Sequence, residues 1–188
     1  INSSLTKDGT SPIQIATGAE NDALKYTEIF TADAKSDGYV VVKEGTELFL
    51  KKHQHSWTYA LKSGTTDTIT ATCTAPGCPL TSGNGGSVTI SAPAANTLTY
   101  DGQGKPATVT ASADWQGPAA NTIKVSYTYG SGNPPTQLEG DAVPTNARTY
   151  TAEIAVGTGD NKATASVTYT IGQQNLLVKA KGTMITYG

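Results

Sequence analysis

Two cysteines and two histidines are the side chains of this sequence best suited to covalent or metal chemistry. Cys73 and Cys78 are the only cysteines, and the segment between them, Thr74 to Gly77, is rich in turn-forming residues. Such a turn can bring two Cα atoms within the roughly 4.4–6.8 Å that a disulfide requires. We therefore expect a Cys73–Cys78 disulfide that shapes a hairpin tip and, because its loop is short, adds about 2 kcal/mol or less.

His53 and His55 open a second interpretation of the same cysteines. The two histidines are two positions apart, so they share one face of an extended strand. If the hairpin brings that face against the cysteine turn, two imidazoles and two thiolates form a tetrahedral zinc site. The sequence thus leaves three states open, namely a disulfide without any cofactor, a zinc site, and solvated histidines at a strand edge.

Trp115 is the aromatic residue best placed to bind a ligand. It lies with Asp114 in the segment Asp114 to Pro118, which has the composition of a loop. An exposed indole suits the apolar face of a pyranose, so Trp115 and Asp114 are candidate residues of a carbohydrate site. Four other aromatic residues occupy alternate positions and are expected to pack in a core or between domains: Trp57, Tyr59, Tyr127 and Tyr129.

The sequence carries no signature of an enzyme. It contains no Gly-x-Ser-x-Gly elbow, P-loop or dinucleotide fingerprint, and both histidines belong to one short segment. The acidic residues are scattered, and Glu139-Gly140-Asp141 lacks the dense carboxylates of a calcium loop. We expect no catalytic residues.

Composition indicates an extracellular β-rich chain. Only 15% of the residues are charged, the net charge is -2, and threonine is more frequent than the 20 glycines. The polarity therefore comes from neutral side chains, which argues against a disordered polyelectrolyte and against a nucleic-acid partner. No apolar run is long enough to span a bilayer, so we expect no membrane insertion. Because the chain starts at Ile1, we take it as a processed or excised segment.

Five short runs with alternating apolar residues lie between residues 87 and 171 and predict a β-sandwich of immunoglobulin size. Period two places the apolar residues of each run on one face of a strand. In addition, Asn146 and Tyr150 have the spacing of a tyrosine corner, in which the Tyr hydroxyl bonds a backbone group. The expected inward residues are Val88, Ile90, Val109, Ala111, Ala113, Ile123, Val125, Tyr127, Tyr129, Tyr150, Ala152, Ile154, Val156, Ala163, Ala165, Val167, Tyr169 and Ile171.

Hairpins are predicted over residues 39–50 and 57–73, and the Gly-rich stretch 81–86 reads as a linker. The chain is therefore expected to be all-β and to divide into four parts. Residues 1–52 are a β-rich segment of uncertain fold, and residues 53–85 are a small hairpin module. Residues 86–172 are a Greek-key, immunoglobulin-like sandwich, and residues 173–188 are a strand leading to a following repeat.

Five segments resemble the bacterial immunoglobulin-like repeats of the YDG or MBG type: Gly86 to Pro93, Leu98 to Gly102, Ala107 to Ala111, Pro144 to Ala152 and Ala163 to Ile171. These repeats occur in large surface proteins of Gram-positive gut bacteria, and the stretch His55 to Tyr59 is similar to a short module that often precedes them. The resemblance implies a monomeric, extracellular cell-surface module that acts as a spacer or adhesion domain. A host or cell-wall glycan, or a protein, would be its ligand.

Overall fold

The chain is all-β. The structure, a computed structural model, describes residues 13–17, 39–45, 47–75, 78, 80, 83–175 and 182. Within these residues it contains three antiparallel sheets, three short 3₁₀ turns and no α-helix. The strand predicted from Asn175 to Ala180 lies almost entirely outside the described residues, as does most of the segment before residue 39.

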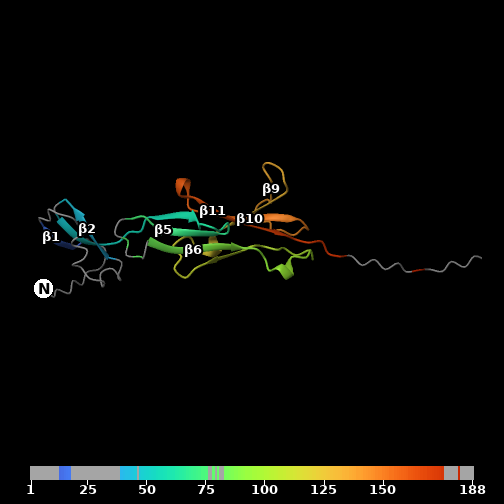
Figure 1. The fold of residues 1–188 in the computed structure, drawn as a ribbon, viewed down its shortest axis with the longest axis horizontal. Coiled ribbons are helices and arrows are strands. Elements are labelled where there is room, and N and C mark those ends of the chain that lie inside the picture. The colour runs from blue at the N-terminus through green and yellow to red at the C-terminus, as the bar shows by residue number, and fades with distance from the viewer. Residues whose placement is uncertain are drawn as a thin grey trace, which may run out of the picture.

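The first sheet is small and has the strand order β1-β3-β2. It comprises β1 (Ile13–Thr17), β2 (Tyr39–Glu44) and β3 (Glu47–Lys52), and Figure 1 shows it at one end of the molecule. The expected hairpin is confirmed, since Tyr39 pairs with Lys52 and Glu44 with Glu47. Gly45 in the turn has a φ of 62°, a backbone conformation that glycine adopts without strain.

The second sheet has four strands in chain order: β4 (Trp57–Leu61), β5 (Thr68–Cys73), β6 (Asn84–Ser91) and β7 (Thr108–Ala111). The hairpin predicted over residues 57–73 is present as β4 and β5. It is not a separate module, however, because β5 pairs directly with β6 along its length. The expected boundary between residues 85 and 86 therefore falls inside one strand of a continuous sheet.

The third sheet has the order β11-β10-β8-β9. Its strands are β8 (Val125–Tyr129), β9 (Thr136–Gln137), β10 (Thr149–Val156) and β11 (Ala163–Thr170). Beyond β11, the chain leaves at the end opposite to β1 and β2 (Figure 1). A parallel bridge ties this exit to the connection between β6 and β7, since Gly172 donates its N–H to Leu98 and accepts one from Tyr100.

The two four-stranded sheets share one hydrophobic core. Its buried residues come from both sheets and confirm the alternation of the sequence, which puts every second side chain of β10 inward. Two expected core residues are exposed instead. Ala111 ends β7, which lies at a sheet edge, and Ala113 lies in the turn that follows β7. The buried apolar members are Ile69, Val88, Ile90, Tyr127, Tyr150, Ala152, Ile154, Val156, Ala163, Ala165, Tyr169 and Ile171.

Close packing surrounds the three glycines of the stretch expected to be a linker. Gly83, Gly85 and Gly86 are all buried at the start of β6. A Cβ on Gly85 would overlap the indole ring of Trp57, and one on Gly86 would meet the backbone of Trp115. Glycine is required here because neighbouring groups occupy the space of a side chain, which composition alone does not distinguish from flexibility.

Candidate functional site

Strand pairing brings the two histidines and the two cysteines together. His53 and His55 lie in the connection between β3 and β4, Cys73 ends β5, and Cys78 lies in the loop toward β6. Trp57 at the start of β4 pairs with Cys73, and the N–H of Thr74 donates to the carbonyl of Ser56. The residues just before β4 therefore lie beside those that follow β5.

The four side chains converge on one point. His53 Nε2 lies 3.5 Å from Cys73 Sγ, and His55 Nδ1 lies 3.6 Å from Cys78 Sγ. One donor atom from each residue can be chosen so that all four lie within 4.8 Å of one another. His53 and Cys73 are buried, Cys78 is half-buried and His55 is exposed, so the cluster lies at the surface with its inner half enclosed.

Aromatic contacts hold the histidine rings in place. The ring of His55 stacks on Trp57 with 4.7 Å between centroids, and its edge contacts the ring of His53 at 4.6 Å. Trp57 in turn rests on Gly85, where no side chain intervenes. The orientation of both imidazoles is thus supported from β4 and β6.

Burial shifts the pKa values of His53 and Cys78 in this cluster. It lowers the pKa of His53, and the neighbouring His55 lowers it further, which favours the neutral imidazole. Burial also raises the pKa of the Cys78 thiol, and the hydrogen bond and charge of Cys73 act in the same direction. Two imidazoles and two cysteine sulfurs are the donor set of a Cys₂His₂ metal site.

The expected disulfide is not formed. Cys73 and Cys78 are both free thiols, and each sulfur has an imidazole nitrogen as a close neighbour. The two sulfur atoms nevertheless lie within 4.8 Å of each other. The histidines lie beside them, and the alternative grouping of His53, His55, Cys73 and Cys78 describes the geometry better.

Trp115 is not an exposed platform. Its side chain is partly buried against the shared core, 5.9 Å from the ring of Tyr59, and its indole N–H donates to the carbonyl of Pro118. Asp114 accepts hydrogen bonds from Ser112 and Asn84, which shapes the same loop. Both residues therefore stabilise the turn after β7.

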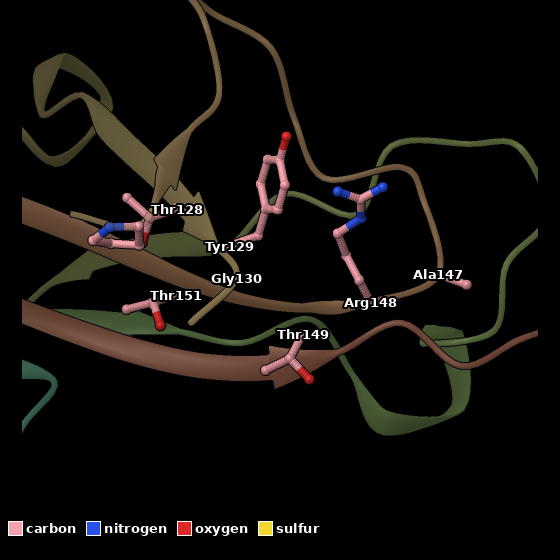
Figure 2. A pocket seen from close by; sticks show the side chains of 8 residues that line it. Thr128, Tyr129, Gly130, Ala147, Arg148, Thr149 and Thr151 are labelled. Atoms are coloured by element: carbon pink, nitrogen blue, oxygen red, sulfur yellow. The ribbon is translucent and has the colours of Figure 1, made fainter. Parts of the chain in front are cut away.

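A surface groove of about 780 Å³ lies elsewhere, on the third sheet. Figure 2 shows the side chain of Arg148 reaching toward Tyr129, and the guanidinium lies 4.4 Å from the ring centroid. Threonine hydroxyls and the loop that leads to β9 complete the lining. No motif in the sequence marks this groove, although Arg148 is the only arginine of the chain. The lining residues are Thr128, Tyr129, Gly130, Pro135, Ala147, Arg148, Thr149 and Thr151.

Comparisons with known proteins found no matching protein-family model, no matching curated protein and no matching solved structure. Within the described part of the chain, no helix has the length and apolar character needed to cross a membrane.

Proposed function

We propose that this chain is a non-catalytic module of a bacterial cell-surface protein, serving as a rigid spacer or adhesion domain in an extracellular array. The module would be immunoglobulin-like, as the resemblance of residues 53 to 188 implies. Two features support this relation: paired antiparallel sheets around one core, and the tyrosine corner formed by Tyr150. The Greek-key connection stays a prediction, because the strands of the second sheet follow chain order.

One observation carries the spacer role. The chain enters the two-sheet body beside β1–β3 and leaves β11 at the opposite end (Figure 1). Copies joined in this way extend end to end. A pull on the two ends acts along the strands, so that many bonds of the β10–β11 ladder share the load.

Pulling a single molecule between handles at its two ends tests this role. We expect one cooperative unfolding event whose length gain corresponds to the two-sheet body. Gly172→Pro removes the N–H that bonds Leu98 and should lower the unfolding force. Gly172→Ala keeps that N–H, meets only an ordinary contact with Leu98 and is the matched control. Gradual extension without a cooperative event would exclude a rigid spacer.

Binding of an acidic glycan is a second candidate function, and the Arg148–Tyr129 groove favours it. Among the described residues, no carboxylate forms an ion pair with Arg148. The guanidinium is therefore available to a carboxylate of a ligand, while the threonine hydroxyls suit hydrogen bonds to a sugar. The groove takes over the role expected of Trp115 and Asp114.

A glycan array that includes uronic and sialic acids tests this candidate. Binding should be lost in Arg148→Ala and retained in Lys124→Ala, which removes an exposed cation away from the groove. If the array shows no binding, or if Arg148→Ala binds as the unchanged protein does, the groove is not a glycan site.

A further inference from the structure

We propose that His53, His55, Cys73 and Cys78 bind one Zn²⁺ ion that locks the junction between the small sheet and the two-sheet body. This site does not depend on the spacer function proposed above. It rests on the identity of the four donors, their separations and their place in the fold.

Two of the separations match those of a tetrahedral zinc centre. With Zn–S bonds of about 2.3 Å and Zn–N bonds of about 2.0–2.1 Å, a tetrahedral angle places nitrogen and sulfur about 3.6 Å apart. The two nitrogen–sulfur distances given above are 3.5 and 3.6 Å. No pair in the cluster exceeds 4.8 Å, which is about 1 Å above the widest separation expected, about 3.8 Å between the sulfurs. Small side-chain rotations close that difference.

The donor set selects the ion. Thiolate and imidazole ligands suit Zn²⁺, whereas Ca²⁺ and Mg²⁺ require oxygen ligands. Four protein ligands fill a tetrahedral shell, so the ion has no open position for a substrate. The site is therefore structural rather than catalytic.

The position of the ligands gives the ion a mechanical role. His53 and His55 belong to the connection that leaves β3, while Cys73 belongs to β5 inside the two-sheet body. In the absence of an ion, this connection is held to β5 by backbone bonds such as Thr74 to Ser56. Four metal bonds add a cross-link there, so binding should raise the midpoint of thermal unfolding.

The test uses the full chain, reduced and freed of metal with a chelator, and then titrated with Zn²⁺ against a chromophoric competitor. We expect one Zn²⁺ per chain and a higher unfolding temperature. Titration with Co²⁺ in place of Zn²⁺ should produce the intense visible bands of a tetrahedral ion together with thiolate charge-transfer absorption.

Two variants remove single ligands. Cys78→Ser changes a loop residue, and His55→Phe keeps a ring to stack on Trp57 while removing the nitrogen ligands. Each should weaken Zn²⁺ binding by more than about 100-fold. Removing a residue that only hydrogen-bonds a metal ligand already lowers the metal affinity by about 10–100-fold. Gln54→Ala, an exposed neighbour of both histidines, should bind as the unchanged chain does. Circular dichroism of each metal-free variant verifies its fold.

Several outcomes would overturn the site. These are less than one Zn²⁺ per chain, unchanged affinity in Cys78→Ser, or the pale spectrum of octahedral Co²⁺. Thiol titration distinguishes the rival disulfide: protein prepared in air with equimolar Zn²⁺ should have no reactive thiol until the metal is chelated, and two thereafter. No thiols after chelation would mean that Cys73 and Cys78 are bonded to each other instead.

Discussion

The hydroxyl of Tyr150 donates a hydrogen bond to the backbone carbonyl of Asn146, with 3.2 Å between the two oxygens. Tyr150 is buried at the start of β10, and Asn146 lies in the loop that leads into that strand. The same loop meets the segment that leads into β7, because the carbonyl of Pro144 accepts the N–H of Lys105. The tyrosine corner predicted from the spacing of these residues is confirmed.

Tyr150→Phe should lower the free energy of unfolding by about 1 kcal/mol, because the ring stays packed while one hydrogen bond is lost. Urea unfolding measures the change. Tyr100→Phe, at an exposed tyrosine, is the control and should have almost no effect. Equal effects of the two substitutions would show that the corner does not stabilise the fold.

Asn161→Ala should destabilise the chain by about 2 kcal/mol, because its amide bonds the edge strand β4 twice. The side chain accepts the N–H of Tyr59 and donates to the carbonyl of Trp57. Alanine leaves both partly buried groups without this partner. Asp160→Ala, at an exposed neighbour in the same turn, is the control in the same unfolding assay. A loss no larger than that of the control would contradict the role of the amide.

Alkaline pH should destabilise the fold through Tyr169. Burial raises the pKa of this phenol, with smaller contributions from Tyr127 and Tyr150, and its hydroxyl donates to the carbonyl of Lys105. A raised pKa in the folded state means that the stabilisation is complete below the ordinary tyrosine pKa and declines as the pH rises above about 10. Unfolding midpoints between about pH 8 and about pH 11 should therefore decline more steeply in the unchanged chain than in Tyr169→Phe. If the unfolding midpoints of the two proteins declined equally with pH, Tyr169 would not be the source of the alkaline destabilisation.

Acid pH should destabilise the fold through Asp101, which lies in the turn before β7. The hydrogen bond from Lys105 lowers the pKa of this carboxyl, and the Lys105 side chain is only 10% exposed. Because the folded-state pKa is lowered, the stabilisation is present above the ordinary value of 3.8 and is lost as the pH falls through the folded-state pKa. Asp101→Asn should lower the unfolding temperature at neutral pH and flatten its acid dependence, whereas Glu139→Gln should do neither. An acid dependence as steep as that of the unchanged chain would exclude Asp101 as its source.

Gly85→Ala should weaken both the fold and Zn²⁺ binding, because the added Cβ overlaps the ring of Trp57 that supports His55. We expect a destabilisation of about 1–3 kcal/mol, typical of overpacking, and a lower zinc affinity by competition titration. Gly172→Ala has room for its methyl group and is the control for both measurements. A stable variant with unchanged zinc affinity would show that Trp57 does not position the imidazole.

Features that depend on local backbone geometry could be predicted from the sequence. The inward faces of β6, β8, β10 and β11 follow from the two-residue period of a strand, and the Tyr150 corner follows from a four-residue spacing. The all-β class and both N-terminal hairpins rest on the same kind of evidence. In each case the residues that decide the outcome are neighbours in the chain.

Features that depend on where distant strands meet were decided by the tertiary structure. The sequence predicted that Gly85 is part of a linker, but in the structure Gly85 packs against Trp57 of β4. The sequence also predicted that Trp115 is exposed, but its ring lies beside that of Tyr59. Likewise, Cys73 and Cys78 favour a disulfide when considered alone. Only the register of β4 on β5 brings His53 and His55, some twenty residues earlier in the chain, within reach of both sulfurs.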